Sequence, residues 1–221
     1  MSKLLKIITP IHLKTQRNYF QRMKDKKIEC MKVARKYNFN YWDGKRKYGY
    51  GGYRYIPNLM RPVAQKLIKK YKLSNKSKIL DVGCGKGFVL FEIKKILPKI
   101  KITGFDISKY GIRNAKKEVK KNLFVHRAQD KFPFKKNEFD LVFSIHCLHN
   151  LKIFDLKKAI KEIQRVGKSK YIALEGYRNE KELFNLQCWA LTAESFFTDQ
   201  EWIWIYNQFG YSGDYEFIYF N

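Results

Sequence analysis

Apolar residues alternate between short runs and helical stripes over most of the chain. Ile79, Leu80 and Val82 form a run that is too short for a helix and suits a buried parallel strand. From residue 88 to about residue 97 the apolar positions recur at the spacing of one helix face. The same alternation predicts strands at 102–106, 123–126, 139–145, 171–174 and 214–220, and helices at 62–71, 108–121 and 154–166, after 179 and after 198. This pattern predicts an α/β fold, a mostly parallel sheet with helices on both faces.

The first part of the chain does not follow this alternation, so we expect an N-terminal segment at 1–62 ahead of a core domain at 63–221. Residues 15–37 carry a helical apolar stripe surrounded by lysines, which indicates either a solvated helix on the domain edge or part of a basic lid. Residues 41–55 contain five tyrosines, one tryptophan, four glycines and four basic residues. So many glycines would be costly in a regular element. We therefore predict an N-terminal helical and aromatic lid that covers a ligand.

The composition fits one globular domain. The 221 residues are 45% hydrophobic and 16% aromatic, enough for a substantial core. No apolar run approaches the ~18 residues that a membrane span needs, and the first residues lack the apolar core of a signal peptide. The cysteines, Cys30, Cys84, Cys147 and Cys188, do not have metal-ligand spacing. We expect reduced thiols, no bound metal and a cytoplasmic protein.

The net charge of +26 is concentrated in the first part of the chain. The first 50 residues carry 14 basic and 3 acidic side chains, whereas residues 151–221 carry 9 and 10. Lysine outnumbers arginine by 36 to 10, a bias that an AT-rich genome alone would produce, although it should also enrich glutamate. Two explanations therefore stay open, codon bias or an anionic partner such as a phosphate, a nucleotide or an acidic glycan.

Three glycines follow the first predicted strand of the core. Gly83, Gly85 and Gly87 stand where the backbone must turn tightly and let a ligand come close. The helix after them directs its N-terminal N–H groups and its positive dipole end towards that ligand. A dinucleotide fingerprint would require glycine in place of Phe88. The loop is therefore typical of a nucleotide cofactor, but it does not match a dinucleotide site.

The run from Asp81 to Gly87, Asp-x-Gly-x-Gly-x-Gly, resembles the first motif of class I S-adenosylmethionine-dependent methyltransferases. Asp106 lies 25 positions after Asp81, where that family places a carboxylate that binds the ribose hydroxyls, and residues 128–130 and 139–144 follow in the family's order. The resemblance covers about residues 75–218. It implies a Rossmann-like class I methyltransferase fold and S-adenosyl-L-methionine as cofactor. That fold usually ends in an antiparallel pair of strands, and the sequence shows only one clear strand there.

The resemblance also implies the cofactor contacts. Asp81 would orient the glycine turn and reach the methionyl amine through water, with capping of the next helix as the alternative. Asp106 would accept both ribose hydroxyls, and residues 128–130 would lie at the adenine edge. The predicted cofactor-binding residues are Tyr50, Asp81, Gly83, Cys84, Gly85, Gly87, Asp106, Ile107, Ser108, Ala128, Gln129, Asp130, Ser144 and Ile145.

Two histidines follow the strand at 139–145, where open α/β sheets place their reacting centre. Methyl transfer is an in-line displacement, so it needs alignment, and it needs a base only when the acceptor carries a proton. We predict His149 as that base, because related enzymes often carry a histidine there that faces the acceptor. His146 should lie nearer the cofactor, and a structural role is the alternative for either ring. Cys147 lacks the flanking residue of the cytosine C5 nucleophile, and the Pro-Pro motif of amino-methylating DNA enzymes is absent from the sequence.

The predicted acceptor is a small, anionic molecule that is methylated at oxygen, such as a sugar, a nucleotide-linked sugar or another precursor of a surface polysaccharide. Residues 41–55 resemble the segment ahead of the core in a group of bacterial small-molecule methyltransferases. The predicted acceptor contacts are Trp42, Tyr53, Arg54, Asn150, Tyr177 and Arg178. Two other functions stay open, methylation of RNA held by a basic and aromatic surface, and a catalytically silent cofactor-binding module that acts through interactions.

Overall fold

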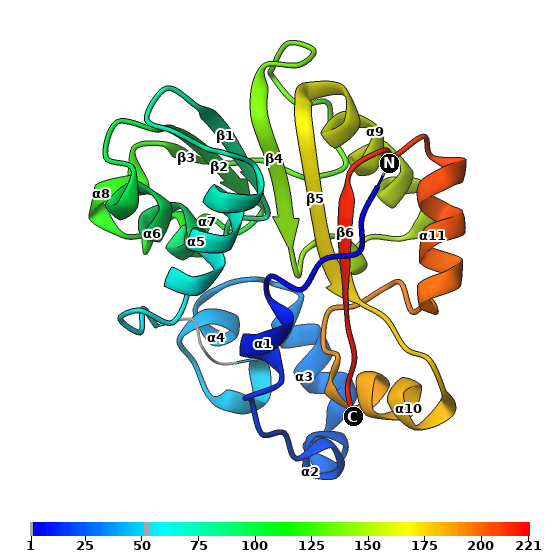
Figure 1. The fold of residues 1–221 in the computed structure, drawn as a ribbon. Coiled ribbons are helices and arrows are strands. Elements are labelled where there is room, and N and C mark those ends of the chain that lie inside the picture. Colours follow the sequence, from blue (N-terminus) through cyan, green and yellow to red (C-terminus); the bar gives the residue numbers. More distant parts are fainter. Residues whose placement is uncertain (1, 51–53) are drawn as a thin grey trace.

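The structure, a computed structural model that describes residues 2–50 and 54–221, is organised around one six-stranded sheet (Figure 1). The strands are β1 Lys78–Val82, β2 Lys101–Asp106, β3 Leu123–Val125, β4 Phe139–Ile145, β5 Gly167–Glu175 and β6 Asp214–Ile218. They lie in the order β3-β2-β1-β4-β5-β6, and each neighbouring pair is parallel. The predicted α/β fold with a parallel sheet is confirmed.

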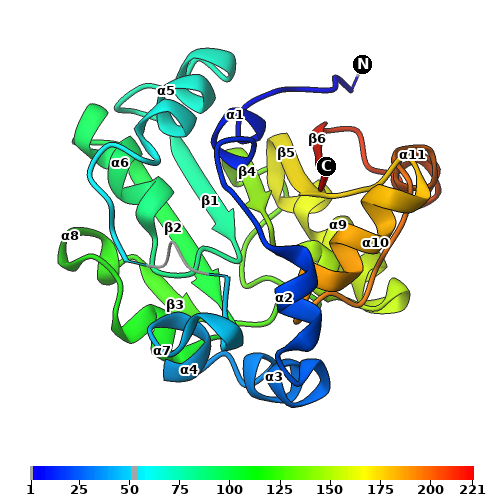
Figure 2. The same ribbon diagram turned by 90° about the horizontal axis from the view of Figure 1, so that it is seen from below.

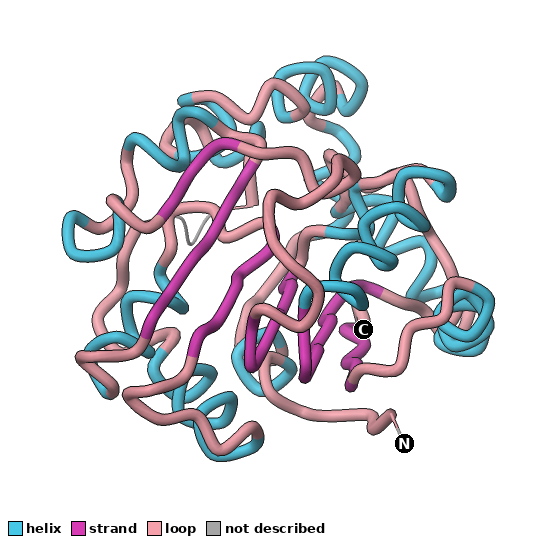
Figure 3. Tube along the Cα trace, turned by 90° about the horizontal axis from the view of Figure 1, so that it is seen from above, coloured by secondary structure: helices cyan, strands magenta, loops and turns pink. Residues whose placement is uncertain are grey.

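Helices cover both faces of the sheet, and Figure 3 shows the strands between them. They are α1 Thr9–His12, α2 Tyr19–Lys24, α3 Lys27–Ala34, α4 Phe39–Trp42, η1 Arg46–Tyr48, α5 Arg61–Lys70, α6 Phe88–Ile96, α7 Lys109–Arg113, α8 Lys117–Lys120, η2 Leu148–Asn150, α9 Ile153–Val166, α10 Glu180–Trp189 and α11 Asp199–Gln208. Successive strand residues point to opposite faces. Ile79 therefore packs in a core with α5 and α6, whereas Leu80 packs in a second core with α9 and α11.

The sheet order reverses beside β1, which has β2 on one side and β4 on the other. The loops that follow β1 and β4 therefore leave the sheet in opposite directions, and a crevice opens at the carboxyl ends of these strands. The Ser144 hydroxyl of β4 donates to the carbonyl of Val82 at 2.9 Å and ties the two strand ends together. The loops with the glycines and the histidines both begin at this crevice.

The N-terminal segment lies across the carboxyl ends of the strands, where α1, α2, α3 and α4 are seen in Figures 1 and 2. Its first residues run beside β6. The Leu5 N–H donates to the Tyr215 carbonyl at 2.9 Å, and the Tyr215 N–H donates to the Lys3 carbonyl at 3.0 Å. The fully buried Glu216 accepts hydrogen bonds from three successive backbone N–H groups, those of residues 7–9. These bonds join parts of the chain that are more than 200 residues apart in sequence.

Several predicted helices are shorter than expected. The predicted helix at 15–37 is divided into α2 and α3, because Lys26 between them has a left-handed backbone with φ of 49°. The predicted helix at 108–121 is divided at Lys116, which is extended, with ψ of 131°. The helix after 179 ends at Trp189, since Ala190 is extended with ψ of 133°. The last helix has the predicted Thr198 cap, in a full capping box with Glu201.

The end of the sheet also departs from the resemblance. The implied antiparallel pair is absent from the described residues, where β6 follows α11 and pairs parallel with β5. None of the described helices is long and apolar enough to cross a membrane. The boundary between residues 62 and 63 stays a prediction, and Ile7 and Ile8 of the N-terminal segment share an apolar core with residues of the core domain.

Candidate active site

Glycines shape the loop after β1. Gly83 and Gly85 have positive φ angles of 80° and 55°, and a Cβ on Gly83 would lie 2.3 Å from the Cys147 sulfur. Only glycine fits there without strain. Two successive N–H groups of the loop donate to the Phe105 carbonyl of β2 at 2.9 Å, so the loop is held against the sheet. Gly87 is the N-cap of α6 and packs away from the crevice.

Two carboxylates stand at the ends of β1 and β2. Burial and the nearby Asp106 raise the pKa of Asp81, which is 4% exposed. The Asp106 carboxylate accepts hydrogen bonds from the N–H of Gly85 at 2.9 Å and from the N–H of Ser108 at 2.8 Å. Burial raises the pKa of Asp106, while these two bonds act in the opposite direction. Each Asp106 oxygen keeps a further lone pair for a hydroxyl group.

A cavity of about 630 Å³ runs from the glycine loop to the histidines that follow β4. Asp106 and Gly85 line it, and so do His149 and Asn150. The Asn150 side-chain oxygen is buried and has no hydrogen-bond partner in the described part of the chain. A glycine loop and a carboxylate with free lone pairs fit the methionyl chain and the ribose of S-adenosylmethionine. The volume of the cavity suits one S-adenosylmethionine molecule together with a small acceptor.

Most of the predicted cofactor-binding residues meet in this cavity. Those that line it are Tyr50, Asp81, Gly83, Cys84, Gly85, Asp106, Ile107, Ala128, Gln129 and Ile145. Gly87, Ser108, Asp130 and Ser144 do not line it. Ser108 caps α7, and its Oγ accepts a hydrogen bond from Trp42 Nε1 at 2.7 Å. Asp130 is exposed and lies 3.9 Å from Arg127.

Glu175, the last residue of β5, joins the two predicted catalytic histidines. His146 Nδ1 lies 2.7 Å from Glu175 Oε1, and His149 Nδ1 contacts Oε2. Burial alone would raise the pKa of Glu175, but the two histidines hold it well below its usual range. The ionised carboxylate can accept the Nδ1 proton of His146, and the same tautomer of His149 would leave each Nε2 free to accept a proton. His149 is buried, and the more exposed His146 has a left-handed backbone with φ of 54°.

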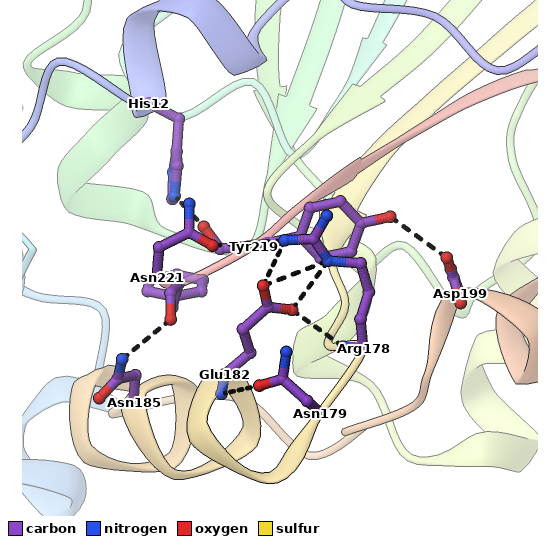
Figure 4. Close-up of polar contacts among 9 residues, drawn as sticks. His12, Arg178, Asn179, Glu182, Asn185, Asp199, Tyr219 and Asn221 are labelled. Carbon is purple, nitrogen blue, oxygen red and sulfur yellow. Dashed lines mark hydrogen bonds and ion pairs between the residues drawn. The ribbon is translucent and has the colours of Figure 1, made fainter.

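The N-terminal segment contributes residues that sequence reasoning missed. His12 of α1 stacks on His146, with ring centroids 6.4 Å apart, and its Nε2 lies 3.0 Å from the Tyr219 carbonyl (Figure 4). Arg17 lines the cavity beside it. Their sequence carries no motif, and only the contact with β6 brings them to the site. Trp189 of α10 also lines the cavity.

Some of the predicted acceptor contacts line the cavity and others do not. Trp42 and Asn150 line the cavity, Arg54 is exposed, and Tyr53 lies outside the described residues. Tyr177 and Arg178 are not brought to the cavity, contrary to the prediction. The Arg178 guanidinium pairs with Glu182 and lies 4.0 Å from the centre of the Tyr219 ring (Figure 4). A carboxylate four residues along the chain thus holds this arginine on the surface.

The aromatic segment packs on the glycine loop. The Trp42 ring lies over Gly85, where a Cβ would be 2.8 Å from the indole. Asp43 pairs with Lys86 of the loop at 2.8 Å. Tyr50 turns its hydroxyl to the backbone, where it accepts a hydrogen bond from the Leu191 N–H at 2.6 Å. The described part of the segment therefore forms a wall of the cofactor end of the cavity.

The cysteines are free thiols, and burial raises the pKa of Cys147. A thiol with a raised pKa is a poor nucleophile at neutral pH. In the described ranges, no three His, Cys, Asp or Glu side chains are grouped as metal ligands.

Comparisons with known proteins agree with this geometry. A family model described as a methyltransferase domain matches residues 73–210. The putative methyltransferase YrhH of Bacillus subtilis is 28% identical over 137 residues, which cover 58% of this chain and 74% of that protein. The demethylmenaquinone methyltransferase of Chlorobaculum tepidum is 33% identical over 114 residues, 51% of this chain and 46% of the enzyme. This chain thus spans less than half the length of that relative, and about a third of several others.

The crystal structure of the YcgJ protein from Bacillus subtilis superimposes with a TM-score of 0.54 at 18% identity, and the match covers 66% of each chain. At this identity the likeness supports the fold alone. The family model covers more than half of the chain and includes the glycine loop, both carboxylates and the two histidines. The chain therefore belongs to the methyltransferase domain family and is a class I methyltransferase whose cofactor is S-adenosylmethionine.

Proposed function

We propose that the protein transfers a methyl group from S-adenosylmethionine to a hydroxyl oxygen of a small, anionic acceptor. The observation that supports this most strongly is the position of Glu175, His146 and His149 in the cavity that the glycine loop also lines. A base is needed when the acceptor is a hydroxyl group and is of little use when it is already a good nucleophile. A sugar, a nucleotide-linked sugar or another precursor of a surface polysaccharide is the acceptor class that we favour.

His149 is the base in this proposal. Its Nδ1 contacts Glu175 Oε2, and a carboxylate that accepts the Nδ1 proton would keep Nε2 unprotonated. When bound, S-adenosylmethionine supplies a methyl carbon attached to a positively charged sulfur. As the acceptor oxygen bonds to that carbon and the carbon–sulfur bond breaks, the hydroxyl proton passes to His149 Nε2. Because His149 is 6% exposed, little water competes for this proton.

The walls of the cavity support a small acceptor. His12 of α1, Trp42 of α4 and Trp189 of α10 all line it, so side chains from three elements surround a ligand from several sides. Pockets of this kind bury most of a small molecule. An RNA substrate would instead require a basic surface that follows the backbone of the nucleic acid.

The proposal is tested by incubating the protein with S-adenosylmethionine labelled in its methyl group. One sample receives a small-molecule extract, and the other receives total RNA from the same cells. The label should enter a small molecule that an anion-exchange resin retains, and mass spectrometry should place the methyl group on oxygen. Label in RNA would contradict the acceptor class. Cofactor binding without transfer to either sample would favour the silent module.

A further inference from the structure

Arg17 is a cation that the N-terminal segment brings into the cavity. It lies between α1 and α2 and is half-buried. Its Nη1 donates to the carbonyls of His12 and Thr15 at 3.3 and 3.1 Å, and its Nη2 donates to His12 Nδ1 at 3.1 Å. Its Nε is buried and has no hydrogen-bond partner among the residues that the structure describes. No carboxylate of those residues forms an ion pair with it, and the Tyr19 phenol interacts with the guanidinium through a side-chain hydrogen bond.

His12 fixes the direction of this guanidinium. An arginine can only donate hydrogen bonds, so His12 Nδ1 must accept the bond from Arg17. His12 Nε2 therefore carries the ring proton and donates to the Tyr219 carbonyl (Figure 4). Burial and the charge of Arg17 lower the pKa of His12 to about 3, so the ring is neutral. The Nη groups of Arg17 are thus held by His12 and the Thr15 carbonyl, while its Nε has no partner among the described residues.

The surroundings of Arg17 leave its positive charge without a close counterion. The rings of Trp189 and Phe220 lie 5.5 and 5.2 Å from its Cζ and provide flat, apolar walls. The nearest buried carboxylate of the cavity, Glu175, is already shared by two histidines. Arg46 adds a second guanidinium to the lining, 4.9 Å from the centre of the Trp189 ring. The acceptor end of the cavity therefore favours a negative charge.

The position of Arg17 relative to the histidines suits one small molecule. Arg17 contacts His12, and His12 stacks on His146, which shares Glu175 with His149. An anionic group bound at Arg17 would therefore lie one stacked ring away from the two histidines. The rest of a small acceptor can then extend towards the Nε2 atoms and the cofactor end of the cavity.

We propose that Arg17 binds the anionic group of the acceptor, a carboxylate or a phosphate, through the Nε side of its guanidinium. Arg17 then decides which small molecules can present a hydroxyl group to the histidines. This inference rests on the proposed function and gives its acceptor a recognition residue. It places an acceptor contact in the segment between α1 and α2, whereas the predicted contacts Arg54 and Arg178 lie outside the cavity lining.

The test measures binding and does not depend on turnover. Benzoate and phenyl phosphate are titrated calorimetrically into the protein saturated with S-adenosylhomocysteine. At least one of them should bind, and the tighter of the two shows whether the site selects a carboxylate or a phosphate. Arg17→Gln should weaken that binding by about 10- to 100-fold, the effect of one charge-assisted hydrogen-bonded contact. Arg17→Lys keeps the charge but loses the planar fork, so its effect should be intermediate.

Lys14→Gln is the matched control, because it removes the same charge from an exposed position three residues earlier. It should bind the probes like the wild type. Unchanged binding by Arg17→Gln, equal weakening by Lys14→Gln, or no binding of either probe to the wild type would overturn the inference. S-adenosylhomocysteine titrations separate the two proposals, because a wild type that does not bind it contradicts the proposed function itself. If Arg17→Gln does not fold, the calorimetric titration is made with Arg17→Lys instead. Wild-type affinity of that variant for the probes would overturn the inference.

Discussion

Glu175 serves two histidines at once because each of its oxygens contacts a different ring. A single carboxylate therefore sets the tautomer of both His146 and His149. The sequence placed the histidines correctly after β4, but it pointed to Tyr177 and Arg178 as the functional residues that follow β5. The decisive side chain is the strand residue Glu175, and it is recognisable only when β4 and β5 are seen side by side.

The role of the histidines leads to a kinetic prediction. His149→Ala should lower kcat by about 10²- to 10⁴-fold, because the hydroxyl proton loses its acceptor, and cofactor affinity should change little. His146→Ala should mainly weaken cofactor binding. A loss of rate in His146→Ala with full rate in His149→Ala would reverse the two roles.

Asp106 leads to a binding prediction. Asp106→Ala should weaken S-adenosylmethionine binding by about 2–4 kcal/mol, since it removes the buried carboxylate that we expect to accept both ribose hydroxyls. Asp130→Ala is the control, because Asp130 is exposed and does not line the cavity. Calorimetry should show little change for the control. Wild-type affinity in Asp106→Ala would show that Asp106 does not bind the ribose. Wild-type protein that binds NADH as tightly as S-adenosylmethionine would contradict the assignment of the cofactor.

His12 leads to a prediction about pH and stability. Its folded-state pKa of about 3 lies below that of an unfolded histidine, near 6.5, because burial and Arg17 disfavour its charged form. Between these values only the unfolded state takes up the proton, so the free energy of unfolding falls as pH falls. The slope from this group is up to about 1.4 kcal/mol per pH unit. Urea unfolding from pH 7 to 5 measures this slope as the difference in the free energy of unfolding between the wild type and His12→Gln. If the two free energies change in parallel with pH, His12 does not contribute the predicted pH dependence.

At the scale of elements, the sequence predicted the sheet better than the helices. The strand at 139–145 was predicted with its observed bounds, because a mostly buried parallel strand is rich in apolar residues and only Asp140 and Ser144 interrupt this one. The helices at 15–37 and 108–121 were not predicted to break, since Lys26 and Lys116 have no local signal for their backbone angles. Their conformations depend on tertiary contacts, such as the one between Lys27 and the Cys188 carbonyl at 2.7 Å.

The same distinction applies to the site. The cofactor end was predictable because a glycine loop and two strand-end carboxylates have fixed spacing within one βαβ unit. The acceptor end was not predictable, because His12 and Arg17 reach it only through a turn of α1 that Glu216 holds. No spacing in the sequence connects residues that lie more than 200 positions apart.

The aromatic segment leads to a prediction about local dynamics. Backbone N–H groups at residues 41–50 should exchange more slowly with solvent deuterium once S-adenosylmethionine is bound, because Trp42 and Asp43 contact the glycine loop that the cofactor orders. Residues 139–145 of β4 provide the internal control and should not change. Equally slow exchange at residues 41–50 with and without the cofactor would show that this segment is ordered whether or not the cofactor is bound.

At the scale of the whole molecule, Glu216 connects the N-terminal segment to the sheet. Its carboxylate accepts hydrogen bonds from three backbone N–H groups, from the Thr9 hydroxyl at 2.5 Å and from the Tyr171 hydroxyl at 2.6 Å. It is fully buried, so water cannot replace these bonds while α1 stays in place. The position of His12 and Arg17 therefore depends on a residue of β6.

Glu216 leads to a stability prediction. Glu216→Ala should lower the free energy of unfolding by about 3 kcal/mol or more, because several buried donors lose their acceptor. Glu216→Gln keeps the shape but turns an NH₂ group towards those donors, so it should be intermediate. Chemical denaturation measures the loss, and trypsin should cleave the basic N-terminal segment faster in both variants. Wild-type stability in Glu216→Ala would show that α1 is held by its apolar contacts.

The pairing of residues 3–9 with β6 also sets an order of events during synthesis. Residue 7 is bonded to a carboxylate 209 positions later, so it must wait until nearly all of the described chain has left the ribosome. Strands β1 to β5 can already assemble by then, because each pairs with a neighbour made earlier or soon after. A nascent chain that ends before β6 would thus already have the glycine loop and both histidines at the crevice, but the N-terminal segment would not yet cover them. Arg17 and His12 would reach that crevice only in the last step of folding.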